Sequence, residues 1–184
     1  AEAWPRGYRH VANLSRAMAR EKGDAARALR ALDKGLRRFF VQAYQSWLFN
    51  QVLARRIDAL DDVMEGDLAM KHDTGGVFEV EDVAVERERA RDFEISATGP
   101  LFGARMRRPG GEPDRIEQAV LTEAGMRLED FPERGPYRVD GARRALRFPV
   151  EEASVEPGRD EAGEFLEFRF TLPPGSYATA LLRE

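Results

Sequence analysis

The sequence of 184 residues contains no cysteine, which excludes a disulfide scaffold, a cysteine-ligated zinc site and thiol catalysis. Its two histidines, His10 and His72, lie far apart and lack a second ligand at a familiar spacing, so no metal site is expected. No apolar run approaches the roughly 20 residues of a membrane span, and the first residues lack the apolar core of a signal peptide. We therefore expect a cytoplasmic protein with no membrane partner.

The chain also lacks a complete catalytic constellation that residue chemistry alone would reveal. No G-x-x-x-x-G-K-[ST] phosphate loop occurs, and the acidic residues between Glu79 and Glu86 are explained by a solvated face. Asp73-Thr74-Gly75 is the triplet of aspartic proteases, in which two carboxylates share a proton. The second aspartate would have to come from a dimer, and Asp and Gly are expected in a turn in any case.

Charge is divided unevenly along the chain. Residues 1–56 hold 12 Lys and Arg against 4 Asp and Glu, whereas the remainder holds 17 against 29. A basic segment joined to an acidic body fits a nucleic-acid contact on one face. It fits charge complementarity between packed parts of the protein equally well.

The first sixty residues are predicted to be helical, and the remainder mixed. Apolar spacing predicts helices over 8–21, 25–32 and 36–60, with Asp24 as an N-cap. Further helices are expected over 83–91, 114–124 and 177–184. Strands are expected over 68–71, 77–80, 93–96, 144–150 and 165–172, with a hairpin turn over 72–76 and loops over 98–103 and 156–163.

The helix from Phe39 to Ile57 is predicted to organise the other elements. Its apolar residues share one broad face that we expect to be buried: Phe40, Ala43, Tyr44, Trp47, Leu48 and Val52. The opposite side carries the amides Gln42, Gln45, Asn50 and Gln51. Amides beside aromatic rings suit either a dry, hydrogen-bonded seam or a ligand wall.

Several short motifs in order along the chain carry a resemblance to a known family. They are AYQSWLFN at 43–50, GD…HDTGG at 66–76, SATGPLFG at 96–103, GARR at 141–144, and LPPGSYAT with LLRE at 172–184. Together they span about Leu36 to Glu184 and closely resemble the TruD family of tRNA pseudouridine synthases.

The resemblance implies an enzyme that converts a uridine in tRNA to pseudouridine without cofactor or metal. In that family a catalytic aspartate attacks a flipped-out nucleotide, and the base is detached, turned and rejoined through carbon. The implied fold is α+β: a helical lead-in and joint helix at 1–60, a mixed α/β insertion domain at 61–162, and a strand and helix at 163–184 that return to a pseudouridine-synthase-type sheet. The family motif G-x-K-D-x-x-A-x-T is not in the sequence, so the nucleophilic aspartate is expected upstream.

The resemblance also implies where the uridine would bind. Residues expected to line its pocket are Gly175, Ser176, Tyr177 and Thr179, with Phe49 and Asn50 buttressing it and Arg183 contacting a phosphate or an acidic neighbour. Candidate RNA backbone contacts are Arg105, Arg107 and Arg108.

The expected partners are tRNA and the missing N-terminal catalytic portion, in cis or as a separate chain, without which this chain should be inactive. Two alternatives remain open at this stage. One is a non-catalytic RNA-binding or assembly module, and the other is a dimeric aspartic protease acting through Asp73.

Overall fold

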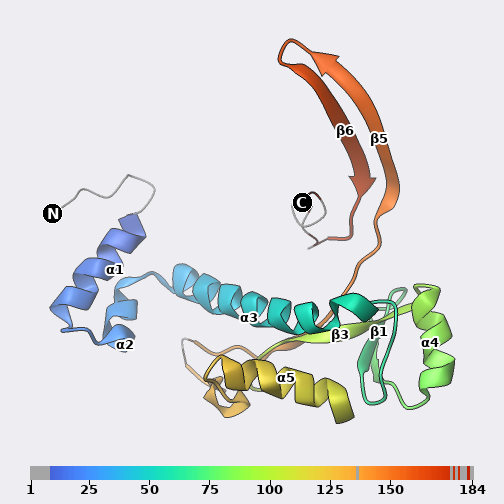
Figure 1. Ribbon diagram of the computed structural model, residues 1–184. Coiled ribbons are helices and arrows are strands. Elements are labelled where there is room, and N and C mark those ends of the chain that lie inside the picture. Colours follow the sequence, from blue (N-terminus) through green and yellow to red (C-terminus); the bar gives the residue numbers. More distant parts are fainter. Residues whose placement is uncertain (1–8, 136, 175, 177, 179–181, 183–184) are drawn as a thin grey trace.

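The N-terminal part of the computed structural model is helical, as the sequence predicts (Figure 1). The structure describes residues 9–135, 137–174, 176, 178 and 182. Its first helices are α1 (Arg9–Arg20), α2 (Ala25–Ala28) with the 3-10 turn η2 (Leu29–Ala31), and α3 (Lys34–Arg56) with η3 (Ile57–Ala59). Asp24 caps α2 by accepting a hydrogen bond from the backbone N–H of Arg27, and Asp33 caps α3 through the N–H of Leu36.

A four-stranded antiparallel sheet forms the body of the protein beside α3. Its strands are β1 (Leu68–Lys71), β2 (Val77–Glu79), β3 (Ile95–Leu101) and β4 (Ala142–Ala145), in the order β2-β1-β3-β4. The hairpin β1–β2 and the helix α4 (Val83–Arg91), capped by Asp82, confirm their predictions. The helix α5 (Gly111–Glu123) begins three residues before the predicted start, and η4 (Leu128–Asp130) follows it. None of the helices in the described parts of the chain is long and apolar enough to cross a membrane.

Two clusters of buried side chains hold the body together. One lies around the sheet, where Phe49 of α3 joins Ala69, Ile95 and Ala97 of the strands. The other joins α3 to α5 and to the segment that follows α5, through Leu48, Val52, Phe102, Val120, Leu121 and Phe131. The helix α3 therefore contributes to both clusters, and it packs directly on β3.

The prediction of which face of α3 is buried is wrong in its main part. The side chains buried within the chain are Gln45, Leu48, Phe49, Val52 and Arg56. Phe40, Ala43, Tyr44 and Trp47, predicted to be buried, are exposed. The physical reason is that α3 is apolar on both sides, so periodicity could not distinguish the side that meets the sheet.

Two strand predictions around the sheet are also corrected. Residues 98–101, predicted as a loop, belong to β3 and pair with Ala142–Ala145, because a neighbouring strand satisfies the backbone despite Gly99 and Pro100. The predicted strand over 144–150 is wrong, since β4 ends at Ala145 and the next strand begins at Glu151.

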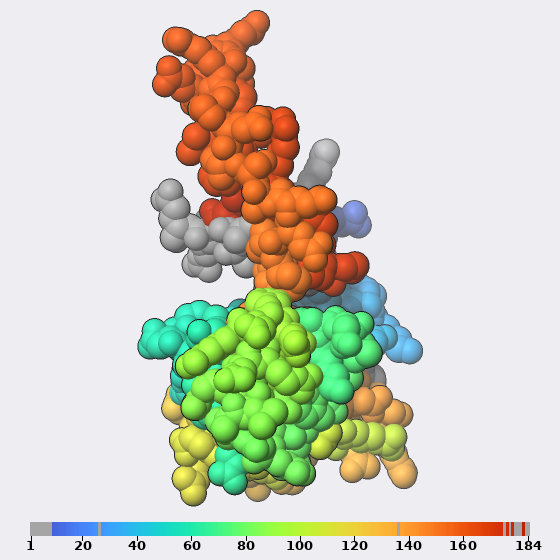
Figure 2. Space-filling model, turned by 90° about the vertical axis from the view of Figure 1, so that its right-hand side faces the viewer, coloured from blue at the N-terminus to red at the C-terminus, as the bar shows by residue number. Residues whose placement is uncertain are grey.

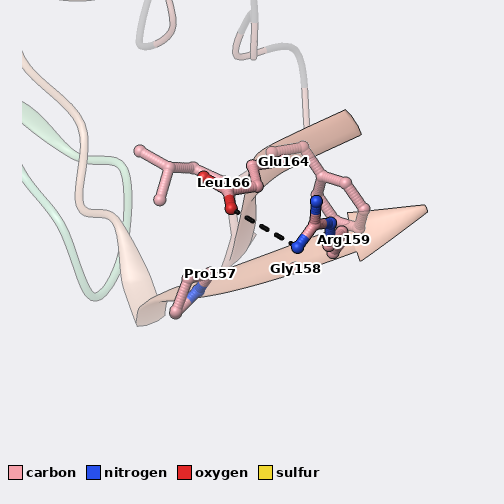
Figure 3. A pocket seen from close by; sticks show the side chains of 6 residues that line it. Pro157, Gly158, Arg159, Glu164 and Leu166 are labelled. Atoms are coloured by element: carbon pink, nitrogen blue, oxygen red, sulfur yellow. Dashed lines mark ion pairs between the residues drawn. The ribbon is translucent and has the colours of Figure 1, made fainter. Parts of the chain in front are cut away.

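The C-terminal part contains a long hairpin that protrudes from the body (Figures 1 and 2). It consists of β5 (Glu151–Asp160) and β6 (Gly163–Thr171), which pair antiparallel. The predicted loop over 156–163 is therefore wrong, because residues 156–160 are strand and the turn is confined to 161–162. Across this turn Arg159 faces Glu164 (Figure 3). The ring of Phe165 lies against Gly158.

Candidate functional site

The segment Thr98–Gly103 connects the sheet to α3, although its sequence suggested a loop. The buried side-chain amide of Gln45 donates a hydrogen bond of 2.5 Å to the carbonyl of Phe102. Gly99 lies against the ring of Phe49, and Gly103 lies so close to Gly141 that a Cβ at 103 would be 2.2 Å from its nitrogen. Among the four amides singled out from the sequence, Gln45 alone is buried. Of the two roles predicted for the amides, Gln45 therefore has the first: it is part of a buried, hydrogen-bonded seam between α3 and the segment after β3.

Arg143 holds the same segment from the other side. Its guanidinium donates to the hydroxyl and carbonyl of Thr98 at 3.0 and 2.8 Å, and to both carboxylate oxygens of Glu117 at 3.0 and 2.7 Å. Thr98 in turn donates to the carbonyl of Leu68. Burial raises the pKa of the Glu117 carboxyl, and the hydrogen bonds from Arg143 act against that rise. The GARR motif was visible in the sequence, but its structural partner Glu117 carried no signal there.

Phe49 and Asn50, the predicted buttresses of the uridine pocket, point to different environments. Phe49 is buried in the core, with the guanidinium of Arg144 5.4 Å from its ring centroid. Asn50 is exposed, and its side chain makes no hydrogen bond with another described residue. Phe49 can therefore position α3 against the sheet, whereas Asn50 is free to meet another surface.

The three arginines predicted to contact RNA backbone differ in their pairing. Arg107 lies 3.6 Å from Glu79 and donates to the carbonyl of Val77. Arg108 forms a bidentate pair with Asp114, which raises the pKa of the guanidinium. Arg105 is exposed and has no ion pair within the described ranges. Of the three, Arg105 has the side chain most available to an external phosphate.

Most of the predicted uridine-pocket residues lie outside the described residues: Gly175, Tyr177, Thr179 and Arg183. Most of the predicted helix over 177–184 falls there as well. Of the predicted set, Ser176 is described. It is half-buried, and its backbone N–H donates to the carbonyl of Pro173 at 3.1 Å, just after β6 ends.

His72 is half-buried at the end of β1. Its ring stacks on Phe93 at 4.5 Å, and its Nε2 lies 2.7 Å from the hydroxyl of Ser96. Arg147 also donates to that hydroxyl, and its guanidinium lies 4.3 Å from the Phe93 ring centroid. Burial, followed by the positive charge of Arg147, lowers the pKa of His72. The neighbouring Asp73 is exposed in the β1–β2 turn.

The apolar side chains that the described structure leaves exposed gather on α3 and on the hairpin. On α3 they are Phe39, Phe40, Tyr44 and Trp47, with Tyr44 and Trp47 stacked at 5.5 Å, and Ile57 of η3 follows them. On the hairpin they include Val155, Phe165, Leu166 and Phe168. Exposed apolar patches of this kind mark sites of contact with another protein, a membrane or a ligand.

Comparison with known proteins places these features in a family context. The family model described as tRNA pseudouridine synthase D (TruD) matches residues 1–184. The tRNA pseudouridine synthase D of Geotalea daltonii is 44% identical over 183 residues, which cover 100% of this chain and 45% of the relative. That of Thermus thermophilus is 48% identical over 151 residues, covering 81% of this chain and 40% of the relative.

A solved structure is similar over nearly the whole chain. It is the putative tRNA pseudouridine synthase D (TruD) from Methanosarcina mazei, with a TM-score of 0.77 and 29% sequence identity. The match covers 98% of this chain and 45% of that one. The chain thus spans less than half the length of the relatives it matches.

Proposed function

Because the chain belongs to the TruD family of tRNA pseudouridine synthases, we propose that it forms part of an enzyme that isomerises a specific uridine in tRNA to pseudouridine. The match over the whole chain, to relatives of that name and to a solved TruD structure, carries this proposal. In such an enzyme the uracil is detached from its ribose and rejoined through carbon. The target base must leave its stack to be reached, so a pocket has to accept it. We place this enzyme in the cytoplasm, where it would act on tRNA.

The exposed apolar surfaces support a role as part of a larger enzyme. The relatives contain more than twice the length that this chain matches. We propose that the remaining part of a TruD-type polypeptide, in cis or as a separate chain, covers the outer face of α3 and the apolar side chains of the hairpin. Large exposed aromatic residues on both surfaces fit the apolar core of such an interface.

The hairpin also bears on how the chain divides into domains. The predicted boundary at 162/163 falls in the turn between β5 and β6, whose strands pair along their length. We propose that β5 and β6 act together as the unit that reaches the catalytic portion, with 61–150 as the body of the insertion.

The proposed uridine pocket lies where β6 gives way to the LPPGSYAT motif. In our proposal Gly175, Ser176, Tyr177 and Thr179 contact the uridine, Arg183 contacts a phosphate or an acidic neighbour, and Asn50 contributes from α3. The nucleophilic aspartate comes from the portion outside this chain. Arg105 contacts RNA backbone, with Arg107 and Arg108 beside it.

The test joins this chain to the part of the Geotalea daltonii relative that it does not match. The chimera is incubated with tRNA transcripts, and pseudouridine is measured by mass spectrometry of the digested RNA. We expect pseudouridine from the chimera, and none from this chain or from the relative's part alone. A folded chimera that binds tRNA but forms no pseudouridine would overturn the proposal.

A matched pair of variants tests the pocket. In the chimera, Thr179→Ala should lower the rate at least tenfold, because a hydroxyl that bonds the substrate is lost. Thr74→Ala, in the exposed β1–β2 turn, should leave the rate unchanged. Equal rates in the two variants would remove Thr179 from the site.

A further inference from the structure

Six cations on the helices α1 to α3, and on the turn and the 3-10 segment that join them, have no ionic partner in the described structure. All are exposed, and no carboxylate among the described residues lies within 4.0 Å of any of them: Arg9, Arg16, Lys22, Arg30, Lys34 and Arg38. We call this set the basic helical face. Figure 1 shows α1, α2 and the start of α3 at the end of the molecule away from the four-stranded sheet.

The carboxylates of the same region are already engaged. Residues 9–56 contain three: Glu21 pairs with Arg20, Asp24 pairs with Arg27 and caps α2, and Asp33 caps α3. None remains to neutralise the basic helical face.

Most of the described arginines after residue 56, by contrast, have an ionic partner. In the body and the hairpin, ion pairs hold ten of them: Arg87, Arg89, Arg107, Arg108, Arg115, Arg127, Arg138, Arg143, Arg159 and Arg169. Many of the carboxylates after residue 56 lie beside these arginines, and two others, Asp67 and Glu123, pair with Arg56 and Arg55 at the end of α3. Among the described residues, none of these carboxylates lies within 4.0 Å of the six cations of the basic helical face, so the charge of that face is available to an external anion.

The arrangement of these cations suits a phosphate backbone. Arg9 and Arg16 are seven residues apart on α1, which places them on one side of the helix about 10 Å apart. Asn13 and Arg20 fall on the same side, so this stripe is polar throughout. Lys34 and Arg38 are neighbours at i, i+4 on α3, where like charges repel each other unless an anion lies between them.

We propose that the basic helical face binds the phosphate backbone of the tRNA substrate, away from the isomerised uridine. This inference rests on the proposed function, which supplies tRNA as the polyanion. Nucleic-acid interfaces are polar and strongly positive, as this stripe is. A protein partner with an acidic surface would ordinarily also contact an apolar interface core. The outward stripe of α1 has no such core, which favours a nucleic acid over a protein.

The test compares two variants of the 184-residue chain that lose the same number of positive charges. The first removes four cations of the basic helical face: Arg9→Gln, Arg16→Gln, Lys34→Gln and Arg38→Gln. The matched control removes four exposed arginines that are ion-paired: Arg115→Gln, Arg127→Gln, Arg159→Gln and Arg169→Gln. Circular dichroism establishes that both variants fold as the parent does.

The Kd for a tRNA transcript is measured by fluorescence anisotropy over a series of salt concentrations. Each phosphate contact contributes about 0.7 to 0.9 to the slope of log Kd against log salt. We expect the first variant to lose about 3 from that slope and to bind at least tenfold more weakly, with the control within twofold of the parent.

Two outcomes would overturn the inference. One is a first variant that binds tRNA with the Kd and salt slope of the control. The other is a first variant that loses pseudouridine formation in the chimera at unchanged Kd, which would assign the face to a protein contact. A chimera that forms no pseudouridine defeats the proposed function alone, since the binding comparison is made without catalysis.

Discussion

The two antiparallel sheets of this chain differ in what covers their apolar side chains. In the four-stranded sheet, Ala69, Ile95 and Ala97 are buried in one cluster with Phe49 of α3 and Ala90 of α4. In the β5–β6 hairpin, Leu166 and Phe168 are 60% and 49% exposed, although β6 has the cleanest alternation in the sequence. Strand patterning therefore specifies a face that can be buried, and a second layer decides whether it is. No element among the described residues covers these two side chains of the hairpin.

The largest expected effect comes from the buried ion pair between the last residue of α3 and the residue that precedes β1. Arg56 and Asp67 form two hydrogen bonds of 2.9 Å, with side chains 4% and 1% exposed. Asp67→Ala leaves the guanidinium charge buried without its partner, so the free energy of unfolding should fall by about 3 to 5 kcal/mol. Denaturant titration followed by tryptophan fluorescence measures the change.

The exposed pair Arg115–Glu112 is its control. Glu112→Gln should cost less than about 1 kcal/mol, because water screens both side chains. Equal losses from the two variants would contradict the distinction between buried and solvated pairs.

The next prediction tests the difference between the two sheets directly, by shortening one apolar side chain in each. Ile95→Ala removes a fully buried side chain of β3 and should destabilise the protein by about 2 to 5 kcal/mol. Leu166→Ala on β6 should change the stability of the chain by no more than about 0.5 kcal/mol. Thermal unfolding of the two variants decides the matter, and a large loss from Leu166→Ala would mean that the hairpin face is covered within this chain.

A smaller effect concerns pH and the cluster beside the four-stranded sheet. The pKa of His72 is lowered by burial and by Arg147, so on acidification the unfolded chain takes up a proton before the folded chain does. Stability should therefore fall as the pH drops from 6.5 toward the lower pKa of the folded state, and it is fully restored above 6.5. Unfolding free energies measured from pH 7.5 to 5 show this slope.

His72→Phe should reduce that slope, while His10→Asn, at an exposed position on α1, serves as the matched control. If the slope survives in His72→Phe and disappears in His10→Asn, the pH dependence does not come from His72 and the prediction is wrong.

The smallest expected change in stability is also the sharpest test of what covers the hairpin. Leu166→Ser with Phe168→Ser should leave the melting temperature nearly unchanged, because both side chains are already exposed. The same double variant should lose binding to the unmatched part of the Geotalea daltonii relative, supplied as a separate chain. Ser154→Ala on the exposed strand β5 is the control. Undiminished binding by the double variant, measured by calorimetry, would remove these two side chains from the interface.

Much of the fold could be predicted because local rules govern it. Asp24 caps α2 where its sequence indicated, and the turn residues between β1 and β2 produced the expected hairpin. The strand through Thr98–Leu101 could not be predicted, since its backbone is satisfied by β4, more than forty residues away. The pair of Arg143 with Glu117 was missed for the same reason.

The amino-acid sequence by itself determined the helices, the family resemblance and the concentration of positive charge before residue 57, because these depend on neighbours in the chain and on composition. The tertiary structure alone decided which side of α3 meets the sheet, which arginines find carboxylates and which apolar strand stays uncovered. Each of these outcomes depends on contacts between residues distant in sequence. The sequence of a helix or strand shows which of its faces can be buried. The packing of other elements determines which of those faces is buried.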